Sequence, residues 1–183
     1  MIPHVPILRH GVTYRSLDTR ALRDANTDVP FAEVSLANPG LVRRDAKRHP
    51  TLSFPPEARG PALERAAEAL MGELSMDPAQ APLSRETFRA LVSASTGLSD
   101  SVIDAQLGLL AESLATLSRV CSDLPDTPVD KLAVVLPSNA LGVNRAWLPA
   151  LVYGASVALK PGALDPFAPH RLVAALIHGG FPA

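Results

Sequence analysis

The chain has 183 residues, with 17 basic and 18 acidic side chains, 47% hydrophobic residues and 19% charged residues. This size and composition fit one globular domain with a sizeable core and exclude an intrinsically disordered chain. The formal net charge of -1, with no long run of like charges, gives no electrostatic footprint for nucleic acid or for an anionic membrane.

The chain is expected to be a soluble protein of the cytoplasm. Prolines and charged residues interrupt its first ten residues, so a secretory signal is not predicted. The longest uncharged stretch, residues 146–159, contains a proline and a glycine and is too short to cross a bilayer. The single cysteine, Cys121, cannot form an intrachain disulfide, which fits a reducing compartment.

Residues 1–36 are predicted to form an extended N-terminal arm. Val5 and Ile7, then Val12 and Tyr14, alternate with polar residues on either side of Gly11, as is typical of two short strands joined by a turn. Because an isolated hairpin is only marginally stable, this arm must lie on another part of the protein.

Residues 37–130 are predicted to form a helical region. Asn38 and Pro39 are a cap and a first helical residue, and the helix that they begin should end at Pro50. A second helix is expected over about 61–75, followed by a linker at 77–82.

Two more helices complete this region. Ser84 caps the first of them, and Gly97 fits the left-handed position just past its end. The second follows Ser99 and has the clearest amphipathic pattern in the chain. Its apolar stripe consists of Ile103, Leu107, Leu110, Leu114, Leu117 and Cys121. Two prolines in residues 124–130 end the helical region.

Residues 131–183 are predicted to start an α/β domain. The run 132–136 is apolar and rich in valine, as expected for a strand that is buried on both faces. A helical run at 143–153, a strand at 156–160 and a helix over about 167–178 follow, with Leu172, Val173, Leu176 and Ile177 facing inward. The fold class is therefore α/β: a helical N-terminal region plus the first β-α-β-α part of a doubly wound parallel sheet. Two parallel strands leave both sheet edges open, so a longer chain or a partner chain must add strands.

Polar residues follow both predicted strands. Pro137, Ser138 and Asn139 follow the first, and Lys160, Pro161 and Gly162 follow the second. Ligands of an open parallel sheet bind at the carboxyl ends of its strands, so both loops should face one crevice. The Asn139 amide can hold a developing oxyanion, and the Lys160 ammonium can contact a phosphate or a ribose, close to the backbone at Gly162. The simpler interpretation is an ordinary turn and a solvated strand end.

Other groups of side chains carry weaker signals. The histidines lack metal-ligand spacing, so no metal site and only surface or capping roles are expected for them. They are His4, His10, His49, His170 and His178. The basic residues Arg43, Arg44, Lys47 and Arg48 should form a solvated helix face, and Trp147 should pack in the core.

Four motifs in the last third of the chain resemble the start of the cofactor-binding domain in the aldehyde dehydrogenase superfamily. They are Pro-Ser-Asn at 137–139, a proline-containing helix around Pro149, Lys-Pro at 160–161, and Pro166 before a helix that ends in Gly-Phe-Pro at 180–182. Upstream, the stretches VPILRHGVTYRSLD, 37–45 and 93–98 are also similar to one bacterial branch of this superfamily.

This resemblance implies NAD(P)-dependent oxidation of a small-molecule aldehyde, or reduction of an acyl thioester, by an enzyme of which the chain is an N-terminal portion. It implies that the Asn139 side chain donates to the oxyanion of the thiohemiacetal. Leu136, Pro137 and Ser138 would pass beside NAD or NADP, and Lys160 would contact the adenosine ribose. Gly162 and Ala163 belong to the same cofactor loop. Ala163 stands where the family often has a glutamate, which leaves room for the 2′-phosphate of NADP.

The family places its nucleophilic cysteine, its general base and its glycine-rich cofactor turn beyond the position of Ala183. Cys121 lies on an inward helix stripe and does not replace the nucleophile. We therefore expect no aldehyde oxidation by these residues alone. Relatives carry an extra strand pair before the first strand, which helps their subunits associate, and this chain has no space for it. A homo-oligomer or a completing partner chain stays open. An inactive nucleotide-binding module and a helical interaction protein that uses the stripe from Ile103 to Leu117 stay open as alternatives.

Overall fold

The N-terminal hairpin is present in the computed structural model, which describes residues 3–47, 54–75, 77, 80–120, 131–138 and 140–182. β2 (Ile7–Arg9) and β3 (Val12–Tyr14) pair antiparallel. His10 and Gly11 form the turn between them, with φ values of 47° and 74°. This confirms the predicted turn at Gly11 and the pairing of a strand at Ile7 with one at Val12 and Tyr14, whereas Val5 lies in a separate strand outside the hairpin.

A three-stranded sheet, which the sequence analysis missed, lies beside this hairpin. Its strand order is β1-β5-β4, with β1 at His4–Val5, β4 at Thr19–Arg23 and β5 at Pro30–Ser35. β5 runs parallel to β1 and antiparallel to β4. Leu22, Ala32 and Val34 are buried in the main core, so this sheet is fixed to the rest of the molecule.

The predicted caps begin and end two helices as expected. α1 (Pro39–Lys47) begins where the N–H of Leu41 donates to Oδ1 of Asn38 at 2.8 Å. α3 (Arg85–Thr96) begins where the N–H of Thr87 donates to Oγ of Ser84 at 3.1 Å. Gly97 follows α3 with a φ of 73°, a left-handed conformation that glycine adopts without strain. The predicted end of the first helix at Pro50 lies outside the described residues.

The two longest helices pack against each other. α2 (Pro56–Met71) begins about one turn before the predicted start, because Pro56 occupies its first turn and Pro61 lies inside the helix. α4 (Asp100–Val120) buries Ile103, Leu107, Leu110 and Leu114, as its pattern predicts. Cys121 and the prolines of residues 124–130 lie outside the described residues.

The last third of the chain forms the predicted parallel crossover. β6 (Lys131–Val135) and β7 (Ser156–Lys160) are parallel. The predicted helix between them is two pieces, a 3-10 helix η2 (Leu141–Ala146) and α5 (Leu148–Val152). Pro149 explains the break, since proline has no N–H to continue a helix from the preceding turn. Trp147 is buried between the two pieces, which confirms its place in the core.

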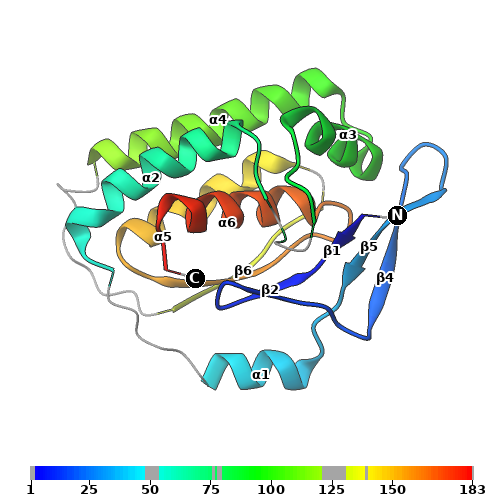
Figure 1. Cartoon of the computed structure of the whole chain (residues 1–183), viewed down its shortest axis with the longest axis horizontal. Coiled ribbons are helices and arrows are strands. Elements are labelled where there is room, and N and C mark those ends of the chain that lie inside the picture. The colour runs from blue at the N-terminus through cyan, green and yellow to red at the C-terminus, as the bar shows by residue number, and fades with distance from the viewer. Residues whose placement is uncertain are drawn as a thin grey trace.

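The outer face of β6 and β7 is exposed, so the prediction of a strand buried on both faces is wrong. Burial alternates along β6: Leu132 and Val134 pack against the core, whereas Ala133 is exposed and Val135 is 73% exposed. Figure 1 shows the helices α4, α2 and α6 (Phe167–Gly179) in successive rows above these strands. The helices α2, α4 and α6 therefore lie on one side of this sheet.

α6 packs tightly against α2. A Cβ on Gly179 would lie 2.9 Å from the backbone nitrogen of Ala66 and would overlap the carbonyl oxygen of Ala62. Leu172 and Leu176 are buried as predicted, but Val173 and Ile177 are only half-buried. Gly180 ends the helix with a φ of 108°. No helix among the described residues is long and apolar enough to cross a membrane.

Candidate functional site

The two predicted site loops start from neighbouring strand ends. Val135 and Lys160, the last residues of β6 and β7, are partners in the parallel register. One residue further, the N–H of Leu136 donates to the carbonyl oxygen of Lys160 at 3.0 Å. The segments that follow β6 and β7 therefore leave the sheet side by side at its carboxyl edge, where open parallel sheets bind ligands.

The two loops are in direct contact at Gly162. This residue is buried, and a Cβ on it would lie 2.5 Å from the Cα of Ser138 and would overlap the carbonyl oxygen of Pro137. The N–H of Ala163 also donates to Oγ of Ser138 at 2.7 Å. Glycine at position 162 is required by this close approach of two backbones, since its own φ is not in the left-handed region. Contact between the loops is thus built into the main chain.

The predicted cofactor residues differ in their exposure. Leu136 is buried, Ser138 is half-buried, and Pro137, Lys160 and Ala163 are exposed. The Lys160 ammonium is therefore on the surface at the strand end, as a ligand-binding role requires. Asn139, the predicted oxyanion donor, lies outside the described residues.

Arg20 is an additional residue at this site that the sequence analysis did not find. It is an exposed residue of β4, and its Nη2 donates to the carbonyl oxygen of Ala163. The two residues are 143 positions apart, so no local pattern could have linked them. Through this bond the N-terminal sheet contacts the loop after β7.

A buried carboxylate anchors the other end of this loop. Oδ1 of Asp165 accepts the N–H of Ala168 at 2.9 Å and so caps the first turn of α6. Burial raises the pKa of Asp165 to about 6, although the N–H groups of Ala168 and Phe167 act in the opposite direction. The carboxylate is turned into the protein and away from the exposed loop residues.

The prediction that each histidine has a surface or capping role is wrong for His170. Its side chain is buried, and neither ring nitrogen has a hydrogen-bond partner among the described residues. Burial lowers the pKa of His170 to about 4, although Asp77 raises it, so the ring is neutral at pH 7. His170 lines a cavity of about 40 Å³ that is also lined by His4, Asp77 and Gln80. This cavity is not formed by the loop residues of the predicted site.

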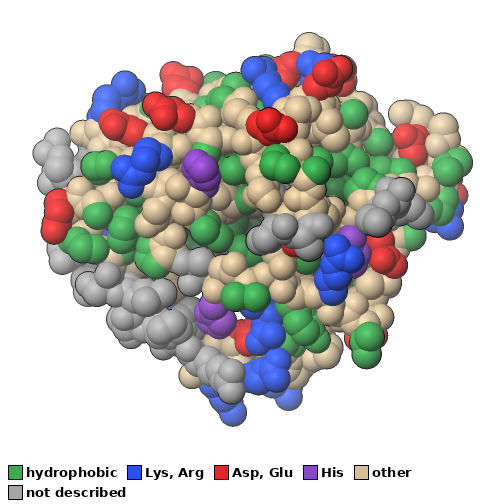
Figure 2. Space-filling model, in the orientation of Figure 1, with side chains coloured by type: hydrophobic (Ala, Val, Ile, Leu, Met, Phe, Trp, Pro, Cys, Tyr) green, Lys and Arg blue, Asp and Glu red, His purple; other side chains and the backbone are tan. Residues whose placement is uncertain are grey.

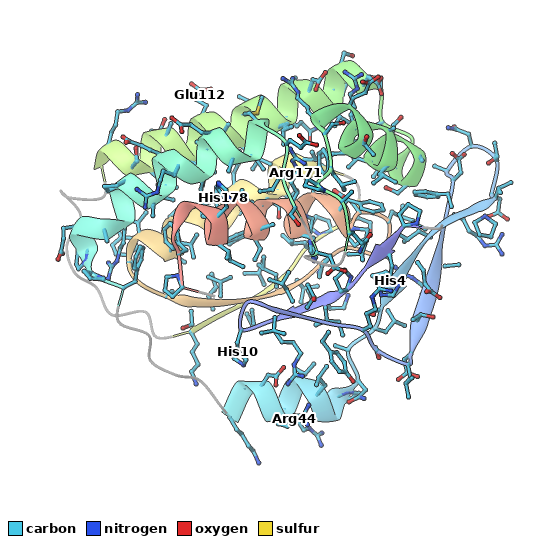
Figure 3. The ribbon with its side chains drawn as sticks, in the orientation of Figure 1. His4, His10, Arg44, Glu112, Arg171 and His178 are labelled. Carbon is cyan, nitrogen blue, oxygen red and sulfur yellow. The ribbon has the colours of Figure 1, made fainter. Side chains whose placement is uncertain are left out.

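His10, His178 and the described part of the basic helix face have surface positions, whereas the His4 side chain is only 10% exposed. His4 contacts Ser35 and Glu33, while His10 and His178 are exposed. Figure 3 shows His10 and His178 at the surface of different elements. His49 and Arg48 lie outside the described residues. Lys and Arg side chains gather over α1 in Figure 2. The described members of this group, Arg43, Arg44 and Lys47, are exposed as predicted.

Arg171 is a buried cation that the sequence analysis did not identify. Its guanidinium donates to the carbonyl oxygens of Leu70, Gly72 and Leu83 and lies 4.8 Å from the centre of the Phe88 ring. Figure 3 shows Arg171 on α6, within the layer of helices. These bonds satisfy carbonyl groups near the end of α2, so Arg171 has a structural role. In the described part of the chain no three His, Cys, Asp or Glu side chains form a group that could hold a metal ion.

No protein-family model matches the sequence, and no curated protein matches it. Solved structures do match. An NAD-dependent aldehyde dehydrogenase from Sinorhizobium meliloti is 16% identical, with a TM-score of 0.80 over 100% of this chain and 40% of its own. An aldehyde dehydrogenase from Bacillus cereus, a G224D mutant, is 16% identical with a TM-score of 0.76, over 98% of this chain and 40% of its own. A betaine aldehyde dehydrogenase from Staphylococcus aureus, a Y450L mutant in complex with NAD+, is 18% identical with a TM-score of 0.76, over 97% of this chain and 39% of its own.

These matches cover nearly the whole chain, and the chain spans only about 40% of the length of the structures that it matches. They confirm the predicted α/β fold class and the resemblance drawn from the sequence motifs. The chain therefore has the fold of the N-terminal portion of an aldehyde dehydrogenase.

Proposed function

We propose that this chain is the N-terminal portion of an NAD(P)-dependent enzyme that oxidises a small-molecule aldehyde or reduces an acyl thioester. The observation that carries the proposal is the contact of the two loops at the carboxyl edge of β6 and β7, through Gly162 and Ser138. This is the edge at which dinucleotides bind to open parallel sheets. The likeness in fold to aldehyde dehydrogenases supports the same assignment.

The residues at this edge fit part of a dinucleotide. Gly162 brings two backbones together without an intervening side chain, so the two loops lie against each other at this edge. Lys160 and Ala163 are both exposed; in this proposal the Lys160 ammonium would contact the adenosine ribose, and Ala163 is small enough that the ribose could lie against it. Leu136, Pro137 and Ser138 line the path of the cofactor on the other loop.

Chemistry at the substrate belongs to Asn139 in this proposal. Its neutral side-chain amide donates to the oxyanion that forms when a nucleophile adds to the aldehyde carbonyl, without losing a proton itself. A bound nicotinamide dinucleotide supplies the hydride acceptor. Because the residues described here include no candidate nucleophile beside these loops, we expect no aldehyde oxidation by the 183 residues alone. Aldehyde oxidation that survives Cys121→Ala would contradict this expectation.

The exposed sheet face supports the view that further protein completes this fold. Ala133, Val135 and Ala158 form an exposed apolar surface on two strands to which no other strand of the described residues is paired. Parallel sheets are normally covered on both faces. In this proposal a longer chain or a partner chain supplies the strands and the segments that would cover this face. The boundaries near residues 36 and 130 separate the N-terminal arm, the helical region and the cofactor domain.

The buried stripe of α4 argues against the interaction-protein alternative. Ile103, Leu107, Leu110 and Leu114 are part of the main core and are not available to a partner. The inactive nucleotide-binding module shares the binding site with our proposal and differs from it only in chemistry.

Calorimetric titration of the 183-residue chain with NAD+ and with NADP+ tests cofactor binding. We expect Lys160→Ala to weaken binding about tenfold, because a charge-assisted contact is lost. Lys131→Ala is the matched control, since Lys131 is an exposed lysine at the opposite end of β6. Absence of binding by both dinucleotides at millimolar concentration, or equal effects of the two substitutions, would contradict the proposal.

A further inference from the structure

We propose that Arg20 makes this site selective for a dinucleotide that carries a 2′-phosphate, as NADP does. The inference rests on the proposed function, because it assigns a role to a residue at the same loop. The carrying observation is the hydrogen bond from the Arg20 guanidinium to the carbonyl oxygen of Ala163, which fixes an exposed cation from the N-terminal sheet at the loop after β7.

The backbone on both sides of this hydrogen bond is well anchored. Arg20 is the second residue of β4 and pairs with Val34 of β5 in the three-stranded sheet. Ala163 is held to the first loop by its N–H bond to Ser138 and follows Gly162, which is packed against the same loop. The guanidinium is therefore positioned by two fixed segments before any ligand arrives.

The charge around this loop is one-sided. Lys160 and Arg20 are exposed cations, whereas Asp165, the one acidic residue between Lys160 and α6, is buried and bonded to Ala168. A free ribose 2′-hydroxyl in dinucleotide sites is commonly held by a carboxylate, while an arginine accommodates a 2′-phosphate. This loop offers two cations and no exposed carboxylate of its own, so it fits the phosphate.

The chemistry of arginine suits this role. Its bond to Ala163 uses an N–H of Nη2, which leaves the rest of the planar fork able to donate to phosphate oxygens. A lysine at the same place would present a single ammonium. It could not bond a main-chain carbonyl and bind a phosphate in a bidentate way at the same time. Arg20 thus holds the loop and recognises the phosphate at once.

The experiment compares two probe pairs on the 183-residue chain: NADP+ against NAD+, and 2′,5′-ADP against 5′-AMP. We expect the 2′-phosphorylated member of each pair to bind about tenfold more tightly, with a difference that shrinks as salt is added. Arg20→Gln should reduce this preference to about twofold or less, because the guanidinium that distinguishes the members of each pair is gone.

Arg23→Gln is the matched control. Arg23 is another exposed arginine of β4, and its partner is Asp28 instead of the site loop. It should leave the preference for both 2′-phosphorylated probes unchanged. Thermal unfolding of each variant separates an effect on binding from a loss of folding. Arg20→Lys, which keeps the positive charge, is measured in the same way.

The outcomes distinguish the two proposals. Binding of both dinucleotides with equal affinity, or an Arg20→Gln variant that weakens both equally, would overturn the role of Arg20 and leave the proposed function standing. A preference for NADP+ that Arg20→Gln does not change would do the same. Binding of none of the four probes would overturn the proposed function and this inference together.

Discussion

Gly162 is the residue on which the contact between the two site loops depends. We expect Gly162→Ala to lower the free energy of unfolding by about 1–3 kcal/mol, because the new methyl group overlaps the backbone of Pro137 and Ser138. Cofactor binding should weaken as well, since the loops must move apart. Urea unfolding measures the first effect and calorimetric titration the second.

Gly108→Ala provides the control for this substitution. Gly108 lies within α4, and a Cβ on it would meet nothing within 4 Å. Alanine should therefore stabilise this helix by about 0.5–1 kcal/mol. If Gly162→Ala is as stable as Gly108→Ala, the close approach of the two loops is not present in solution.

Single residues were predictable from the sequence where their partners are near in the chain. Asn38 and Ser84 cap helices through N–H groups three residues away, so local pattern was enough to find them. Arg20, His170 and Arg171 were missed because their surroundings come from distant segments. Arg171, for example, donates to carbonyl groups 88 to 101 positions away. Asn139 stays a prediction, because it lies outside the described residues.

At the scale of the element, the start of α6 carries two buried groups with opposite effects of pH. The pKa of His170 is lowered from 6.5 to about 4, so between these values the unfolded state binds the proton and acid destabilises the fold. The pKa of Asp165 is raised from 3.8 to about 6, so between these values the folded state binds the proton and acid stabilises the fold. Each effect amounts to about 3 kcal/mol, so the two largely offset each other between pH 4 and 6.

Substitution of one group should expose the effect of the other. Relative to the unsubstituted protein, His170→Leu should gain stability as pH falls from 6.5 to 4, because the proton uptake of the unfolded imidazole is gone. Asp165→Asn should lose stability as pH falls from 6 to 4, although its side-chain oxygen can still accept the N–H of Ala168. Urea unfolding at pH 4.5 and pH 7 measures both slopes.

The comparison with the unsubstituted protein is needed because other carboxylates begin to lose their stabilising contribution as the pH falls toward 4. Asp45 and Asp104 have lowered pKa values, chiefly through hydrogen bonds from Arg9 and Arg89, and their contributions are lost in acid in all three proteins. If the His170→Leu and Asp165→Asn profiles run parallel to that of the unsubstituted protein, the two groups are not buried as described.

Elements with strong local signals were predicted with correct type and position. β7 lies at the predicted residues 156–160, and α4 follows its apolar stripe. β4 and β5 were missed because they are short, carry several charged residues and gain stability mainly by pairing with each other and with β1. The break between η2 and α5 was missed because the apolar pattern continues through Pro149.

For the whole molecule, the exposed face of β6 and β7 predicts a difference between two neighbouring valines. Val135→Thr should change the free energy of unfolding by less than about 0.5 kcal/mol, because Val135 is 73% exposed. Val134→Thr should cost about 1–2 kcal/mol, because Val134 packs against the core. Thermal unfolding of both variants checks this, and equal losses would show that the outer face is covered in the isolated chain.

Sedimentation of the same two variants identifies what covers the face. If a second copy of the chain lies on it, the unsubstituted protein sediments as an oligomer and Val135→Thr weakens this association.

The sequence predicted the α/β class because helix and strand patterns alternate after residue 130. It could not predict the exposed face, since the apolar run at 132–136 is the same whether or not another segment covers it.

The packing of α2 against α6 affects how the protein is made on the ribosome. Ala62 and Ala66 meet Gly179, more than a hundred residues later in the chain. At a translation rate of about 5–20 residues per second, this side of α2 waits on the order of ten seconds for its partner. A nascent chain in that interval presents an apolar helix side to its surroundings, and chaperones that shield such surfaces should contact it until the last helix emerges.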